Sequence, residues 1–371
     1  MNQAYQKLFN PLPLSSKVEL KNRLIMAPMT NFSSNADGTV TPEELAYYAR
    51  RSKGVSMVIT ACTYVTENGK GFPGEFAGHT DEMIPSLQSL ASAIKKEGAK
   101  AILQIFHGGR ACPPNLVPNG ELVSASNVGM EHLPAPRPLT HEEILEIIAA
   151  FGQTTRRAIE AGYDGVEIHG ANGYLIQQFY SGHTNVREDQ WGGNVENRLA
   201  FPLAVVNEVK RIVNEYADDS FIVGYRFSPE EPEENGLTMT DTFTLMEKLV
   251  EKELDYLHVS VNDFWSKPRR GADESKTRIE WILEKVNNRV PVIGVGGIYS
   301  AKDAQKAFES DISLLALGRE LIIDPDWVQK IESGKEEEII TLLDKEKQEE
   351  LVVPDPLWNA ITNAPGWFPG V

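Results

Sequence analysis

The chain has 371 residues, enough for one large domain or two smaller ones, and its composition is that of a globular protein. It carries 53 acidic against 36 basic residues, and the net charge of −17 disfavours nucleic acid as a partner. Two cysteines, Cys62 and Cys112, without C-x-x-C spacing exclude a cysteine-held zinc or iron–sulfur site, and no metal site is predicted.

Short apolar runs bounded by turn residues recur along the chain and are predicted to be strands. They are largely apolar throughout rather than alternating, which is typical of parallel strands covered on both faces. Eight such runs occur, at residues 23–29, 56–65, 99–107, 164–170, 221–227, 255–261, 290–297 and 312–318.

Segments with helical start signals lie between these runs. Residues 41–44, Thr-Pro-Glu-Glu, combine an N-cap, a proline at the first helical position and a capping-box glutamate. Thr140 and Glu143 form a second capping box, and Ser300 with Asp303 starts a further helix. Strands that alternate with helices predict an α/β architecture.

Eight strand–helix units predict a closed (β/α)₈ TIM barrel that occupies residues 1–371 as a single domain. An open doubly wound sheet is the alternative that periodicity does not exclude. The run at about 108–138 is rich in Gly, Pro and Asn and is predicted to be a long excursion over one end of the barrel. A C-terminal helical tail is predicted at about 327–371, with its charged part, 332–350, on the surface.

The active site of such a barrel lies at the carboxyl ends of the strands, where two glycine turns occur. Gly296-Gly297 would let backbone N–H groups approach an anion, and Gly318-Arg319 adds a cation with a bidentate fork. This pattern predicts a site for the phosphate of a cofactor. The alternative is that the glycines only form tight turns.

Arg226 and Gln104 are polar residues within predicted strands. A buried arginine requires an anionic or strongly accepting partner, and an ion pair with Glu167 is one alternative. Gln104 offers one donor and one acceptor, as a ring edge with both N–H and C=O would require. Together these two side chains suit a flavin.

Three residues able to hydrogen-bond, His169, Asn172 and Tyr174, follow the fourth run. Taken alone, such a histidine could simply be bonded to a neighbouring carbonyl. Five segments change this interpretation: NRLIMAPMT (22–30), LQIFHGGR (103–110), VEIHGANGYLIQQF (166–179), WGGNVENR (191–198) and LALGREL (315–321). In the order and approximate spacing of these five segments, the chain resembles the old yellow enzyme family of flavin mononucleotide (FMN) dependent ene-reductases over nearly its whole length.

The resemblance implies an oxidoreductase with bound FMN that takes hydride from NADH or NADPH and reduces the C=C bond of α,β-unsaturated carbonyl compounds. It implies that His169 and Asn172 hold the carbonyl oxygen and that Tyr174 donates a proton. The positions expected to bind FMN are Pro28, Met29, Thr30, Cys62, Gln104, Arg226, Gly296, Gly297, Gly318 and Arg319.

Phe106, Phe264 and Trp265 are predicted to give the substrate pocket aromatic walls. The alternative for Phe264 and Trp265 is that they pack their loop against its own strand. Some family members carry cysteine in place of Thr30 or histidine in place of Asn172. The ending NAPGWFPGV does not resemble the arginine-bearing ends that some members lend to a neighbouring subunit, so a homo-oligomer remains an open alternative to a monomer.

Two other functions are compatible with parts of the pattern. A phosphate-binding barrel lyase or isomerase without flavin would need a Schiff-base lysine or a metal cluster, which no predicted strand offers. A flavoprotein that binds or senses ligands would use the same pocket. No segment reaches the about 18 apolar residues that span a membrane, and no signal peptide is evident, so a cytoplasmic protein acting on a small molecule is expected.

Overall fold

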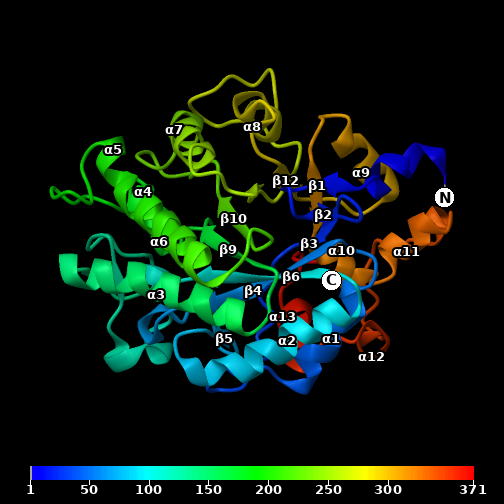
Figure 1. Ribbon diagram of the computed structural model, residues 1–371, viewed down its shortest axis with the longest axis horizontal. Coiled ribbons are helices and arrows are strands. Elements are labelled where there is room, and N and C mark those ends of the chain that lie inside the picture. The colour runs from blue at the N-terminus through cyan, green and yellow to red at the C-terminus, as the bar shows by residue number, and fades with distance from the viewer. Residues whose placement is uncertain (1) are drawn as a thin grey trace.

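A computed structural model describes residues 2–371 and contains a closed barrel of eight parallel strands (Figure 1). β3 pairs with β13 on one side and with β4 on the other, and this second pairing closes the barrel. The strands are β3 (Leu24–Met26), β4 (Met57–Tyr64), β6 (Lys100–Phe106), β9 (Gly165–Gly170), β10 (Ile222–Phe227), β11 (Tyr256–Val259), β12 (Val292–Val295) and β13 (Leu314–Leu317). The predicted (β/α)₈ barrel is confirmed, and the open sheet is excluded.

Helices surround the barrel (Figure 1). They are α1 (Pro42–Ser52), α2 (Ile84–Lys96), α3 (His141–Glu160), α4 (Leu175–Tyr180), α5 (Val195–Arg198), α6 (Ala200–Tyr216), α7 (Met239–Val250), α8 (Arg278–Val286), α9 (Ala301–Phe308) and α10 (Arg319–Ile323). The predicted capping boxes at Thr41, Thr140 and Ser300 are present, and Thr238 and Thr277 add two more. These local signals fix where the helices begin.

The interior of the barrel is apolar at one end and polar at the other. At the amino ends of the strands, the hairpin of β1 (Leu12–Pro13) and β2 (Glu19–Leu20) packs against inward-facing aliphatic residues such as Met57 and Ile222. Towards the carboxyl ends, the buried polar residues are Gln104, Glu167, His169, Arg226 and His258. A buried polar layer needs partners, which directs attention to this end of the barrel.

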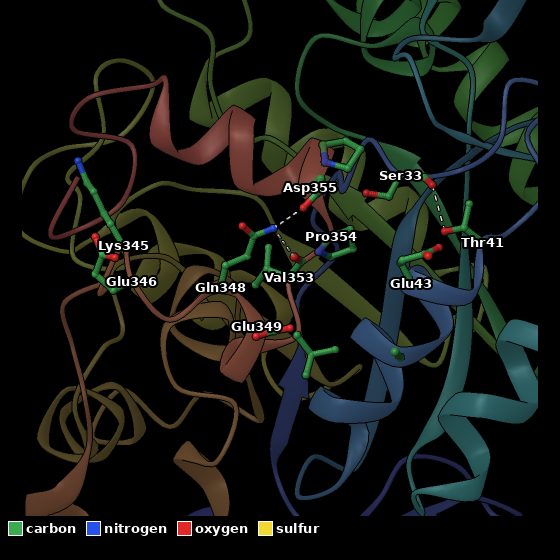
Figure 2. Close-up of a pocket in the computed structure, with 13 residues that line it drawn as sticks. Ser33, Thr41, Glu43, Lys345, Glu346, Gln348, Glu349, Val353, Pro354 and Asp355 are labelled. Atoms are coloured by element: carbon green, nitrogen blue, oxygen red, sulfur yellow. Dashed lines mark hydrogen bonds between the residues drawn. The ribbon is translucent and has the colours of Figure 1, made fainter.

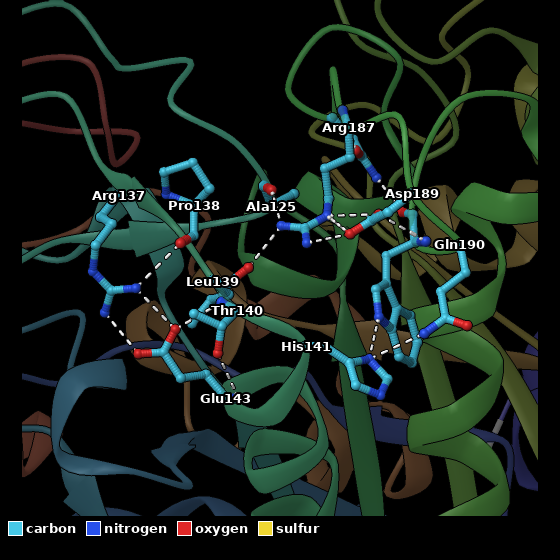
Figure 3. Close-up of polar contacts among 12 residues, drawn as sticks. Ala125, Arg137, Pro138, Leu139, Thr140, His141, Glu143, Arg187, Asp189 and Gln190 are labelled. Atoms are coloured by element: carbon cyan, nitrogen blue, oxygen red, sulfur yellow. Dashed lines mark hydrogen bonds and ion pairs between the residues drawn. The ribbon is translucent and has the colours of Figure 1, made fainter.

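The excursion between β6 and α3 contains η4 (Gly109–Ala111), η5 (Pro114–Leu116), η6 (Pro118–Gly120), β7 (Val123–Ser124) and β8 (Arg137–Pro138). Figure 3 shows how the loop after α4 holds it. Arg187 donates from Nη1 to the carbonyl oxygens of Ala125 and Leu139, at 2.9 and 2.8 Å, and pairs with Asp189 at 2.6 Å. The excursion is therefore anchored to the segment that follows the predicted substrate-binding residues.

The C-terminal segment contains α11 (Trp327–Glu332), η7 (Glu336–Glu338), α12 (Gln348–Leu351) and α13 (Asp355–Thr362). Its charged part, predicted to be helical, is mostly irregular, with only η7 and α12 as short helices. The buried Arg51 of α1 holds the residues that directly follow this part by donating to the carbonyl oxygens of Leu351, at 2.6 Å, and Val352, at 3.3 Å. Because these bonds tie the segment to α1, it packs against the barrel rather than extending into solvent.

Shorter elements complete the described chain: η1 (Gln3–Phe9), η2 (Glu67–Gly69), β5 (Phe76–Ala77) and η3 (Asp81–Met83). Among residues 2–371, none of the helices has the length and apolar character needed to cross a bilayer.

Candidate active site

The candidate site is a cleft of about 650 Å³ at the carboxyl ends of the barrel strands. The predicted residues that line it are Pro28, Met29, Thr30, Asn172, Tyr174, Arg226, Gly296, Gly297, Gly318 and Arg319. Residues that line it without having been predicted include Phe32, Phe72, Ser260, Tyr299, Gly366 and Trp367. Cys62, Gln104 and His169 are buried and lie outside this lining.

The glycine turn after β12 has a geometry that only glycine fits. Gly296 and Gly297 have φ angles of +119° and +66°. A Cβ atom on Gly296 would lie 2.7 Å from the carbonyl oxygen of Val261. Arg319, which begins α10, lines the same cleft and donates from Nη1 to the carbonyl oxygen of Trp367 at 2.9 Å. The turn and the arginine thus lie in one cleft, which is the arrangement that a phosphate site requires.

Arg226 projects from β10 into the cleft lining, and its buried Nε has no hydrogen-bond partner. The alternative of an ion pair with Glu167 does not hold. That carboxylate instead accepts a bond from Gln104 Nε2 at 2.7 Å and contacts His258 Nδ1 at 2.9 Å. A buried guanidinium with an unused donor needs an accepting group from outside the protein chain. With the glycine turn and Arg319, this donor set fits FMN.

Asn172 is held so that its amide nitrogen remains available. Its backbone is left-handed, with φ of +58°, and its N–H donates to Ser228 Oγ at 2.8 Å. Ser260 Oγ donates to Asn172 Oδ1 at 2.8 Å. Because Oδ1 is engaged and Asn172 lines the cleft, Nδ2 is the donor left for a ligand.

We expect Ser260→Ala to weaken the binding of a carbonyl or phenol ligand, because the Asn172 amide would lose the bond that orients it. One lost hydrogen bond is worth about 0.5–1.5 kcal/mol, or about three- to tenfold in affinity. Spectroscopic titration of the oxidised protein with a phenol measures this. Ser266→Ala is the control, since Ser266 Oγ bonds only to the nearby carbonyl of Asp263. Equal effects of the two variants would contradict the orienting role.

Tyr174 and His169 lie against each other, with ring centroids 5.1 Å apart and nearly perpendicular planes. Phe106 was predicted to line the substrate pocket. It is instead buried and absent from the cleft lining, with its ring centroid 4.8 Å from that of Tyr174 and 6.0 Å from that of His169. Burial raises the pKa of Tyr174, so its hydroxyl keeps its proton at neutral pH. Burial, with Arg226 nearby, holds the pKa of His169 well below its usual value, so the ring is neutral.

Cys62 and Thr30 were both predicted to face the flavin. A register shift in β4 before Cys62 places this residue opposite Gln104 on β6. Burial raises the pKa of the Cys62 thiol well above its usual value, with a further contribution from Glu75, so the thiol is neutral. Thr30 lines the cleft directly.

Two aromatic residues predicted for the pocket lie elsewhere. Phe264 is buried against β12, where a Cβ atom on Gly294 would lie 2.5 Å from its ring. Trp265 is partly buried against the main core. Both residues therefore pack their loop against the core, which was the alternative to their lining the substrate pocket. The aromatic residues that do line the cleft besides Tyr174 are Phe32, Phe72, Tyr299 and Trp367, with Phe32 and Phe72 in edge-to-face contact at 5.9 Å.

A second groove, of about 800 Å³, lies between α1 and the segment around α12 and α13 (Figure 2). Its lining carries Glu43, Glu346, Glu349 and Asp355 against a single Lys345, and it includes no residue of a barrel strand. An anionic cofactor would be repelled there, so the cleft at the barrel mouth remains the candidate site.

Comparison with known proteins gives consistent results. Residues 7–338 match the profile of the NADH:flavin oxidoreductase / NADH oxidase family. The chain is 54% identical to the probable NADH-dependent flavin oxidoreductase YqiG of Bacillus subtilis, covering all of this chain and 99% of that protein. It is 43% identical to the NADH:fumarate oxidoreductase of Klebsiella pneumoniae over 95% of this chain, but spans only 38% of that longer protein. Among solved structures, morphinone reductase in complex with tetrahydroNAD has a TM-score of 0.76 and 30% identity, with coverage of 88% and 91%.

Proposed function

Because the chain belongs to the NADH:flavin oxidoreductase / NADH oxidase family, we propose that its barrel-mouth cleft is where NADH is oxidised and an activated alkene is reduced. The predicted resemblance to the old yellow enzymes is confirmed by this membership. The protein is an NAD(P)H-dependent flavin oxidoreductase that uses FMN and reduces the C=C bonds of unsaturated compounds. The roles of individual residues are the proposal developed below.

FMN, when bound, supplies the hydride chemistry that connects the nicotinamide to the alkene. The backbone of Gly296 and Gly297, together with Arg319, would hold its phosphate. Arg226 and Gln104 would bind the polar edge of the ring. The unpartnered Nε of Arg226 supports this assignment, because it is a buried donor that no described residue satisfies.

The observation that carries the substrate assignment is the orientation of Asn172. With Oδ1 engaged by Ser260, the amide presents Nδ2 as a donor to a carbonyl oxygen in the cleft. His169 lies outside the cleft lining but packs against Tyr174, which lines it, and the neutral His169 ring would donate a second hydrogen bond to that oxygen and so draw electron density away from the alkene. Tyr174, which retains its proton, delivers it from Oη to the α-carbon.

We propose NADH rather than NADPH as the electron donor. The cationic side chains in the cleft lining are Arg226 and Arg319, and both are assigned to FMN. The lining therefore offers no further cation for the 2′-phosphate of NADPH, and the net charge of −17 opposes its approach. The names of the two sequence relatives given above, which both specify NADH, support the same choice.

The test is an anaerobic sequence of additions to the purified protein. We expect a yellow protein that releases FMN on denaturation, is bleached by NADH about tenfold or more faster than by NADPH, and is reoxidised by cyclohexenone. A protein that holds no FMN would overturn the cofactor site. Bleaching without reoxidation by the enone would overturn the substrate assignment, and equal rates with the two nucleotides would overturn the donor assignment.

A further inference from the structure

Glu167 is a carboxylate inside the barrel, adjacent to the residues proposed to hold the flavin ring. Its side chain is fully buried on β9. In the strand register it lies opposite Gln104 of β6 on one side and Gly224 of β10 on the other. One carboxylate oxygen accepts from Gln104 Nε2 at 2.7 Å, and the other contacts His258 Nδ1 at 2.9 Å.

Glu167 is ionised. Burial opposes its ionisation, but His258, Arg226 and Gln104 outweigh that effect and hold the pKa of Glu167 below its usual value. Burial lowers the pKa of His258, and the neighbouring Glu167 offsets part of that effect. A carboxylate only accepts hydrogen bonds, so Nδ1 of His258 must carry the ring proton.

The carboxylate also determines how the Gln104 amide is oriented. Because Glu167 accepts only, Nε2 of Gln104 must face it, and rotation of the amide by 180° would place two acceptors together. Oε1 of Gln104 is thus kept free for a donor such as the N–H of a ring edge. Without Glu167, both orientations of the amide would be available.

Arg226 and Glu167 are opposite charges in the same polar layer that do not form an ion pair. Arg226 instead pairs in register with His169 and His258, and its Nε has no partner. Because both side chains are buried, solvent screens their electrostatic fields only weakly, and both fields act on a ligand bound beside them. A group that becomes negative beside Arg226 would therefore experience both the cation and the anion.

We propose that Glu167 is a positioning residue of the flavin site, which holds Gln104 and His258 in one arrangement and lowers the reduction potential of FMN by offsetting Arg226. This inference rests on the proposed function. Reduced flavin gathers negative charge on the edge assigned to Arg226, so a nearby anion disfavours reduction while a cation favours it.

The test compares redox potentials of the FMN-loaded enzyme. Glu167→Gln keeps the shape and removes the charge, and we expect the equilibrium constant for flavin reduction to rise at least about tenfold, which is about 30 mV for a two-electron couple. Arg226→Met should shift the potential in the opposite direction. Glu44→Gln is the matched control, because Glu44 is equally buried and bonded to Ser34 and Thr41 but lies outside the cleft. It should leave the potential unchanged.

The outcomes separate this inference from the proposed function. An unchanged potential in Glu167→Gln, with the expected shift in Arg226→Met, would overturn the role of Glu167 alone. If neither variant shifts the potential, the flavin-edge assignment fails as well. Should Glu167→Gln not retain FMN, the double variant with Arg226→Met removes both charges together. The potential of the double variant must then exceed that of Arg226→Met by about 30 mV, which is the same tenfold factor in the equilibrium constant, and equal potentials would overturn the inference.

Discussion

Replacing Tyr174 by phenylalanine is expected to slow reduction of the alkene by about 10²–10⁴-fold and to leave oxidation of NADH nearly unchanged. Hydride transfer from NADH requires no proton at a substrate carbon, whereas saturation of the alkene requires one. Tyr174 lines the cleft, and burial keeps its hydroxyl protonated. Stopped-flow measurements of flavin reduction by NADH and of flavin reoxidation by cyclohexenone give the two rates separately.

The matched control is Tyr180→Phe. This variant also loses a buried hydroxyl. The Tyr180 hydroxyl donates to the carbonyl oxygen of Asp241 at 2.6 Å, and Tyr180 is not part of the cleft lining. The Tyr180→Phe variant should lower the stability of the protein, but it should not slow alkene reduction relative to NADH oxidation. If Tyr174→Phe slows both half-reactions equally, or slows neither, Tyr174 is a packing or binding residue and the proton comes from elsewhere. Water that enters the cleft would reduce the effect towards the lower end of the range.

The barrel and its helix starts could be predicted because their signals are local. The Thr41 and Thr140 capping boxes each depend on residues three positions apart, and the structure contains both. Likewise, the turn at Gly296 and Gly297 follows from two adjacent glycines, because a side chain would be obstructed at Gly296 and both residues have positive φ angles. Features of this kind need no knowledge of what lies across the fold.

The aromatic walls of the cleft could not be predicted in the same way. Phe264 and Trp265 follow a strand that reaches the barrel mouth, but the path of their loop turns both rings towards the core. Phe72 comes from an irregular segment after β4, and Trp367 from the C-terminal segment. Neither has a sequence pattern that indicates its position, because only the tertiary path of the chain brings it to the cleft.

The partner of Arg226 shows a similar limit. Sequence left an ion pair with Glu167 open, since both residues lie in neighbouring strands. The folded structure decides the matter, because the register places Gln104 opposite Glu167, the side chain of His258 reaches the same carboxylate, and the guanidinium lines the cleft. Residue types alone indicated that Gln104 and Arg226 bind a polar group, whereas the partners of Glu167, His258 among them, required the folded structure.

Replacing the side chain of His169 or of Asn172 is expected to weaken phenol binding by about 10- to 100-fold in each single variant. Each proposed hydrogen bond goes to a charged oxygen, and such a bond is worth about 1.5–3 kcal/mol. A phenolate oxygen resembles the polarised carbonyl, and its ring would stack on the flavin with a long-wavelength charge-transfer band. Titrating that band in His169→Ala, Asn172→Ala and the double variant measures all three affinities.

The double variant is expected to lose less affinity than the sum of the single losses. Both donors act on one oxygen, so removing the first already loosens the ligand that the second would hold. Gln190→Ala is a suitable control, since Nε2 of Gln190 contacts Nδ1 of His141 at 3.1 Å and Gln190 is absent from the cleft lining. Strictly additive losses would mean that His169 and Asn172 bind different atoms. Normal phenol binding in the double variant would remove the proposed carbonyl site altogether, and the polarisation of the alkene would then need another donor in the cleft.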